Sequence, residues 1–242
     1  MLRTPPGSAP VAMSFTRVSG MAALGFAFLI VAGNVVLVPA GLPRTGAGIG
    51  EVDNFFRAHH DLVGIGSALT PVAWVLATVF GAGAVRVLWH AEGERGSAWA
   101  LVGFAGLLLQ NAAFAGVIAV RLALASTAAD GVRADTGLWA LHDAVFTLNG
   151  TFLALALVGL SLGGLRTGLV RPWHGRWGLV SAALMFGSAV LTPWVIDGLG
   201  PLGLLGLAGW LMWLVWIVVY GIVLLRAEPD GRPAADRRPF TS

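Results

Sequence analysis

Charged side chains are scarce in this sequence, and their scarcity excludes most water-soluble folds. Only 11% of the 242 residues are charged, whereas 57% are hydrophobic. A soluble domain usually carries roughly 25% charged residues. The composition therefore indicates an integral membrane protein whose main partner is the lipid bilayer.

Two residue types are missing altogether. The chain has no cysteine, which excludes disulfide bonds, thiolate metal sites and a cysteine nucleophile. It also has no lysine, which excludes a lysine-containing phosphate loop. All 15 basic residues are arginines that separate apolar segments instead of forming one basic surface, so we expect no nucleic-acid partner.

Six apolar segments dominate the chain. Each is long enough to cross a hydrocarbon core of about 30 Å, which takes about 20 residues of helix. A backbone in lipid must satisfy its own hydrogen bonds, which favours helices. We therefore expect an all-α fold, a polytopic bundle of six transmembrane helices within residues 17–226. The predicted spans are residues 18–40, 62–85, 98–120, 144–165, 177–196 and 201–225.

The arginines predict the orientation of these spans. With a cytoplasmic N-terminus, eleven arginines lie on the inner side and four on the outer side. This bias follows the positive-inside rule, so both termini are predicted to be cytoplasmic and the protein to lie in the cell inner (plasma) membrane. Residues 1–16 and 227–242 are predicted to be disordered cytoplasmic tails.

A second interpretation of the N-terminus stays open. Arg3, Arg17, the first apolar run and the small residues at 38–40 also fit a secretory signal with a cleavage site. Cleavage there would leave five spans and an outer N-terminus. In the six-span interpretation, residues 41–61 and 121–143 are expected to form long outer loops.

Polar residues inside or beside the spans predict an outward-facing polar cavity. Amides and charges in a membrane usually face the bundle interior and often mark a pathway. Arg121 would lie near the mouth, with Asp143 or Asp197 as its partner. The alternative is that the amides only hold neighbouring helices together. The cavity candidates are Asn34, Ser67, Gln110, Asn111, Arg121, Asn149 and Asp197.

Two His-Asp pairs open the second and fourth predicted spans. They are His60 with Asp61 and His142 with Asp143, 82 residues apart. Converging imidazoles and carboxylates would hold a divalent metal, and two imidazoles would ligate a haem iron. The simpler interpretation is an acidic residue at the positive end of each helix. A second haem pair is not expected, because His90 and His174 are predicted to lie in inner loops.

The last span is rich in glycine. Residues 198–203 match the G-x-G-x-x-G dinucleotide pattern, but no strand precedes them, so we interpret them as a turn into a closely packed helix. Small residues at helical spacing let helices approach closely in lipid. Trp210, Trp213 and Trp216 are interpreted as packing residues. This span is the predicted surface for a homo-oligomer or a membrane partner.

Two short motifs carry a family resemblance. They are Gly168-Leu169-Val170-Arg171-Pro172-Trp173 followed by Gly178-Leu179, and Arg17-Val18-Ser19-Gly20 before the first span. With these motifs the chain resembles a family of bacterial six-helix membrane proteins known only as a domain of unknown function. The resemblance implies six spans in a bacterial inner membrane. It implies no active-site residue.

The expected function is non-enzymatic. We expect the protein to bind or pass a small molecule or lipid through the outward-facing cavity. One alternative is a haem- or metal-dependent membrane oxidoreductase that uses His60 and His142. Another is a structural or assembly partner that docks through the glycine-rich last span.

Overall fold

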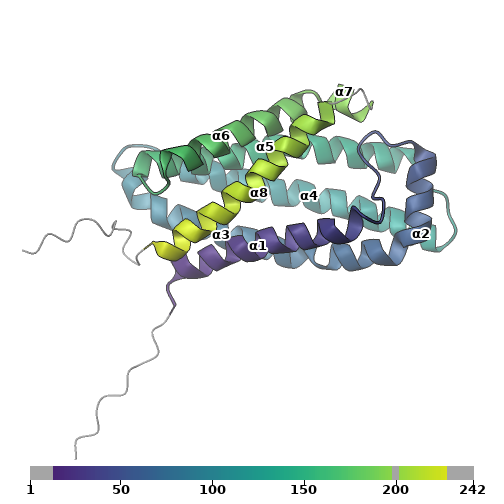
Figure 1. Ribbon diagram of the computed structural model, residues 1–242, viewed down its shortest axis with the longest axis horizontal. Helices are drawn as coiled ribbons and strands as arrows, with labels where there is room; N and C mark the ends of the chain where they lie inside the picture. The colour runs from purple at the N-terminus through teal and green to yellow at the C-terminus, as the bar shows by residue number, and fades with distance from the viewer. Residues whose placement is uncertain (1–12, 198–201, 228–242) are drawn as a thin grey trace, which may run out of the picture.

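The chain folds into long helices that run side by side along one axis (Figure 1). The computed structural model describes residues 13–197 and 202–227. Its helices are α1 (Phe15–Leu37), α2 (Ile49–Ala68), α3 (Thr70–Gly93), α4 (Trp99–Ala129), α5 (Thr136–Thr167), α6 (Pro172–Val190), α7 (Thr192–Ile196) and α8 (Gly203–Arg226). No strand occurs within these described ranges. The predicted all-α fold is therefore confirmed.

Five helical segments are long and apolar enough to cross a membrane: α1, α2 joined to α3 over Ile49–Gly93, α4, α5 and α8. They match five of the predicted spans and indicate a multi-pass membrane protein. The predicted span over residues 177–196 falls on α6 and α7, which are not among the five. The first turns of α6 contain the polar His174 and Arg176, and a new short helix with Pro193 in its first turn follows Leu191.

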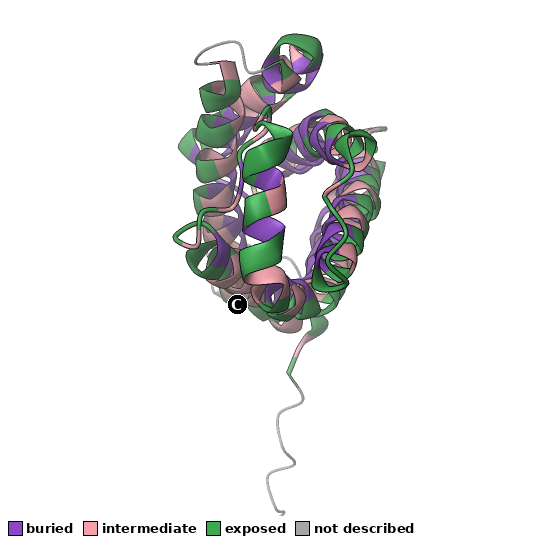
Figure 2. Cartoon of the chain, turned by 90° about the vertical axis from the view of Figure 1, so that its right-hand side faces the viewer, coloured by how far each residue is buried: buried purple, intermediate pink, exposed green. Residues whose placement is uncertain are grey.

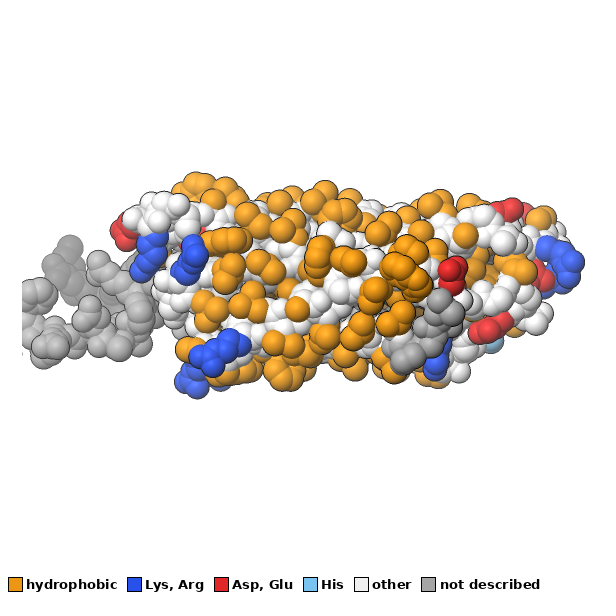
Figure 3. Space-filling model, turned by 90° about the horizontal axis from the view of Figure 1, so that it is seen from above, with side chains coloured by type: hydrophobic (Ala, Val, Ile, Leu, Met, Phe, Trp, Pro, Cys, Tyr) orange, Lys and Arg blue, Asp and Glu red, His pale blue; other side chains and the backbone are white. Residues whose placement is uncertain are grey.

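The two ends of the bundle differ in content. We call the end where α1 begins and α8 ends the proximal end, and the end with α2 and α7 the distal end (Figure 1). Apolar side chains cover the length between them, as Figure 3 shows for one face. Among the described residues, the proximal end carries seven arginines and two acids, and the distal end four arginines and seven acids. The apolar belt and the uneven ends suit a protein that spans a bilayer.

The helices extend further into the predicted outer loops than the sequence suggests. α4 continues to Ala129 and α5 begins at Thr136, so residues 121–143 are mostly helical and the loop shrinks to residues 130–135. Alanine and leucine after Arg121 sustain α4. Asp135 caps α5, because its side chain accepts a hydrogen bond from the Leu138 amide at 2.8 Å. The prediction of a long second outer loop was wrong.

The first outer loop is also shorter than predicted. α2 begins at Ile49, within the expected loop of residues 41–61. His59 has non-helical backbone angles, φ −133° and ψ 23°, and kinks α2. The part before the kink lies across the distal end, in front of the other helices in the end-on view of Figure 2. There Val52, Phe55 and Phe56 pack with Leu124 and Trp139 into a second hydrophobic core.

Small residues let the long helices approach closely. α4 and α5 form the largest helix–helix contact in the bundle. At their crossing, a Cβ atom on Gly103, Gly106 or Gly159 would collide with the backbone of the other helix. A larger core at the centre and proximal end contains Phe26, Phe80, Trp216 and Tyr220. Trp213 packs edge-on against Phe26, which agrees with the packing interpretation of the tryptophans.

The glycines of α8 pack against other helices of the same chain. A Cβ on Gly206 or Gly209 would meet side chains of α6, and a Cβ on Gly221 would meet Ala23 and Gly20 of α1. The interface with another protein through this helix stays a prediction from sequence. Residues 198–201 of the G-x-G-x-x-G match and most of the two predicted disordered tails lie outside the described residues, although Phe15 and Thr16 already belong to α1.

We expect Gly106→Ala to destabilise the bundle while Gly116→Ala on the same helix does not. The new methyl group at position 106 would meet backbone atoms of α5, which cannot move aside. Overpacking of this kind costs about 1–3 kcal/mol. At position 116 the nearest atom is Val145 Cγ1 at 3.9 Å, an ordinary contact. There the helix preference of alanine stabilises by up to ~1 kcal/mol.

Thermal unfolding of the two variants in mild detergent measures this difference. Equal unfolding temperatures for Gly106→Ala and Gly116→Ala would contradict the close α4–α5 crossing.

Candidate binding site at the distal end

A chain of hydrogen bonds joins three elements at the distal end. Arg121 Nε of α4 donates to His142 Nε2 of α5 at 2.9 Å. The other ring nitrogen, Nδ1, lies 2.9 Å from Asp143 Oδ1. Asp143 Oδ2 then accepts a hydrogen bond from the Gly46 amide at 2.8 Å. We call Arg121, His142 and Asp143 the Arg–His–Asp chain.

The geometry fixes the form of the imidazole. A guanidinium can only donate, so His142 Nε2 must be the bare, accepting nitrogen. Nδ1 therefore carries the proton and donates it to Asp143. His142 is then a neutral bridge between a cation and an anion, and neither of its ring nitrogens is free to ligate a metal or to take a proton.

Aromatic side chains hold His142 in place on α5. Trp139 and Phe146 lie three and four residues away, so they share its face of the helix. The Trp139 ring stacks on the imidazole with centroids 4.3 Å apart and planes 10° apart. Phe146 lies nearly parallel on the other side at 6.0 Å.

All three members of the chain are buried. Arg121 is 9%, His142 2% and Asp143 3% exposed. The positive and negative charges balance, which is the condition under which buried charges are tolerated. Arg121 was predicted from sequence to pair with Asp143 or Asp197. Asp143 is indeed close, but the imidazole of His142 stands between the two charges.

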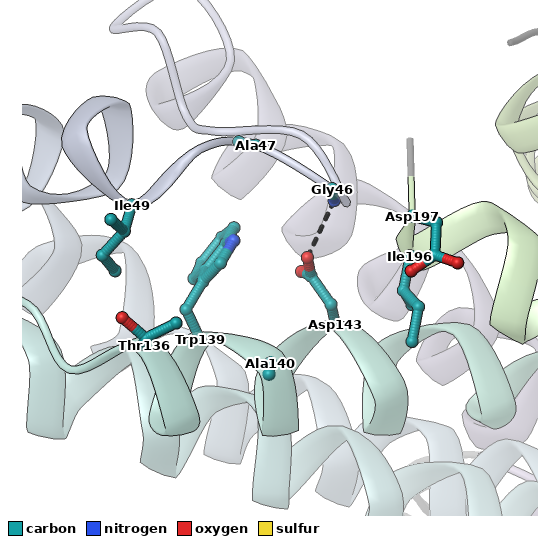
Figure 4. A pocket seen from close by; sticks show the side chains of 9 residues that line it. All are labelled: Gly46, Ala47, Ile49, Thr136, Trp139, Ala140, Asp143, Ile196 and Asp197. Atoms are coloured by element: carbon teal, nitrogen blue, oxygen red, sulfur yellow. Dashed lines mark hydrogen bonds between the residues drawn. The ribbon is translucent and has the colours of Figure 1, made fainter. Parts of the chain in front are cut away.

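A cleft of about 220 Å³ opens beside Asp143 (Figure 4). Its walls come from the loop before α2, the first residue of α2, the first two turns of α5 and the end of α7. Asp143 and Asp197 contribute carboxylates, and Thr136 contributes a hydroxyl group. The Trp139 indole rises from α5 between Ile49 and Gly46 and forms one side of the cleft.

The other cavity candidates do not share this cleft. Asn34 is exposed, and its amide donates to Ile30 O of its own helix at 2.8 Å. Asn111 is buried and donates to Trp74 O of α3 at 3.3 Å, so it links two helices as the alternative interpretation expects. Ser67, Gln110 and Asn149 are buried but are not among the residues that line the cleft. Asp197 is exposed and lines it.

The two His-Asp pairs have opposite surroundings. The Asp61 side chain is 92% exposed and lies 3.5 Å from His60 Nε2, whereas the Asp143 side chain is 4% exposed. His60 Nδ1 lies 3.3 Å from Arg57 O. The two histidines thus have different hydrogen-bond and ion-pair partners. Over residues 13–197 and 202–227, no group of three or more His, Asp or Glu side chains has metal-binding geometry.

The haem or metal interpretation therefore stays a prediction that this geometry does not favour. A metal or haem iron bound to His142 Nε2 would first have to displace Arg121. The prediction that His90 and His174 lie in inner loops was wrong. His90 lies in α3, and His174 lies in the first turn of α6, where its Nε2 donates to Trp216 O at 3.0 Å.

Sequence reasoning missed two parts of the site. Trp139 was not singled out, although its spacing of three residues from His142 is a signal for a shared helix face. Gly46 was placed only within the first predicted outer loop, residues 41–61. Its contact with Asp143 spans 97 positions in the chain, so no local pattern predicts it.

Comparison with known proteins gives no further guide to the site. No protein-family model, curated protein or solved structure matches this chain. The resemblance to a six-helix bacterial family thus stays a prediction.

We expect Asp143→Asn to destabilise the protein far more than Asp61→Asn. The first change removes the charge that balances buried Arg121, and breaking a buried pair costs about 3–5 kcal/mol. The second change alters an exposed carboxylate, and such changes stay within about 0.5 kcal/mol. Denaturant unfolding in mild detergent measures the free energy of unfolding of both variants, which carry the same substitution at the two His-Asp pairs.

A double variant separates charge balance from simple loss of packing. Arg121→Gln removes the unbalanced charge and keeps a donor for His142 Nε2. Added to Asp143→Asn, it should recover about 1–2 kcal/mol, in the range of couplings between contacting residues. A double variant less stable than Asp143→Asn alone would argue against the charge-balance explanation.

Proposed function

We propose that this protein is a six-span protein of the bacterial inner membrane that binds a small molecule or a lipid headgroup on its outer side. In this proposal both termini lie in the cytoplasm and the distal cleft faces outward. The protein acts by binding and not by catalysis.

Three observations support the topology. The arginine-rich proximal end suits the cytoplasmic side. α6 and α7 run beside α5 and α8 along the bundle (Figure 1), which supports them as a sixth span. α1 contributes Ala23 and Phe26 to the larger hydrophobic core, which favours retention of this helix over its cleavage as a signal.

The observation that carries the binding function is the cleft beside an anchored carboxylate. Asp143 cannot turn away from the cleft, because His142 and the Gly46 amide hold both of its oxygens. A binding site needs such fixed polar groups on rigid elements. The space is also small, about 220 Å³, and its wall residue Trp139 packs against Phe56 in the second core, which favours binding over passage.

Catalysis has less support from the same residues. The Arg–His–Asp chain resembles a catalytic triad in composition, but arginine occupies the position of a nucleophile. His142 is locked as a neutral bridge and has no free nitrogen with which to activate a hydroxyl group. Thr136 borders the cleft, and its hydroxyl has no imidazole or carboxylate hydrogen-bonded to it among the described residues.

The lack of native cysteine allows a direct test of sidedness. We expect Ala140→Cys, an exposed position in the cleft, to react with a membrane-impermeant maleimide in intact cells. Glu94→Cys, exposed at the proximal end, should react only after the membrane is permeabilised. The unmodified chain, with no thiol, serves as the zero-labelling control.

The reverse labelling pattern would show that the protein has the opposite orientation, with the cleft on the cytoplasmic side. An Ala140→Cys variant that resists labelling on both sides would show that the cleft is closed.

A further inference from the structure

We infer, on the basis of the proposed function, that the distal cleft binds a small zwitterion, a ligand that carries both an ammonium group and an anionic oxygen. The ammonium group would lie against Asp143 and Asp197. The anionic oxygen would accept a hydrogen bond from the indole N–H of Trp139.

The carboxylates provide the cationic subsite. A carboxylate has about four acceptor sites, and the two bonds described for Asp143 leave capacity for a further donor. Asp197 faces it from the end of α7 as a second, exposed carboxylate (Figure 4). None of the described residues that border the cleft is an arginine. The excess of acids over arginines at the distal end adds a longer-range attraction for a cationic group.

Trp139 provides the anionic subsite. Its side chain is buried at 4% exposure, yet its indole N–H has no hydrogen-bond partner. Figure 4 shows the indole nitrogen on the side of the ring that faces Gly46 and Asp143. An indole N–H only donates, so it requires an acceptor, and a buried donor without one is costly.

The start of α2 reinforces this subsite. The cleft is bordered by Ile49, the first residue of α2, whose N-cap residue Gly48 makes no side-chain capping bond. Helix N-termini carry partial positive charge and amide N–H groups without intrahelical acceptors, which favours an anionic oxygen near Ile49. Thr136, the first residue of α5, also borders the cleft, but the Asp135 side chain already caps that helix.

Neither charge alone satisfies the cleft. A simple cation would leave the Trp139 N–H without an acceptor, and a simple anion would meet two carboxylates. The size sets a further limit, since drug-sized ligands need roughly 300–1,000 Å³ and this cleft has about 220 Å³. A free amino acid and the phosphoethanolamine headgroup of a phospholipid both present the required chemistry.

The test is isothermal titration calorimetry on the full chain purified in a maltoside detergent. The probes are glycine, glycerophosphoethanolamine, ethanolamine and inorganic phosphate. We expect at least one of the two zwitterions to bind at least about tenfold more tightly than ethanolamine or phosphate. Tighter binding of glycine would point to a free solute, and tighter binding of glycerophosphoethanolamine to a lipid headgroup.

Variants locate the binding. Asp197→Asn should weaken zwitterion binding by roughly tenfold. Trp139→Phe keeps an aromatic ring but removes the donor, and should reduce zwitterion affinity to that of ethanolamine. Ala140→Phe should fill the cleft and abolish binding. Ala119→Phe, the same change at an exposed alanine of α4 away from the cleft, and Asp61→Asn should leave binding unchanged.

Several results would overturn this inference. They are equal binding of ethanolamine and the zwitterions, tighter binding of phosphate, no binding of any probe, or zwitterion binding that Asp197→Asn and Ala140→Phe leave intact. If these occur while Ala140→Cys is still labelled from outside, the ligand class is wrong and the outward binding site stands. If Ala140→Cys cannot be labelled, the proposed function itself fails.

Discussion

The burial of one arginine sets the architecture of the distal end. Arg121 lies at 9% exposure, where a lone charge would be strongly unfavourable. His142 accepts a hydrogen bond from the Arg121 guanidinium and donates one to Asp143. The negative charge of Asp143 balances the positive charge of Arg121. Because Asp143 also binds the Gly46 amide, the same interaction ties α4, α5 and the loop before α2 together. The floor of the cleft is thus rigid as a consequence of charge balance.

A second constraint places the site at the end of the bundle. In their proximal half, α4 and α5 touch through Gly103, Gly106 and Gly159, and α1 and α8 touch in the same way at Gly20 and Gly221. Such close crossings leave little room between helices in lipid. Towards the distal end α4 and α5 extend further, and α2 turns across the bundle at His59, so larger side chains such as Phe56 and Trp139 fill the gap. The carboxylates and the indole of the cleft gather where this second core meets the surface.

The sequence predicts the helices well and the site only in part. Apolar length identifies five membrane-length helical segments, because that signal is local and strong. The sequence also marks Arg121, His142, Asp143 and Asp197 as candidates. It cannot separate the two His-Asp pairs, since exposed Asp61 and buried Asp143 follow histidine in the same way and differ only in what packs around them. Amides such as Asn34 and Asn111 are equally ambiguous, because which face of a helix meets lipid depends on neighbours far away in the chain.

The central claim is that His142 is a neutral bridge, with its proton on Nδ1 and its Nε2 accepting from Arg121. Nitrogen-15 NMR of ring-labelled histidine measures this directly, and comparison with a His142→Gln variant assigns its signals among the five histidines of the chain. At neutral pH the account predicts a protonated Nδ1 and a bare Nε2 for His142. A signal from the doubly protonated ring, or from the tautomer protonated on Nε2, would be incompatible with the Arg121 hydrogen bond and would contradict the account.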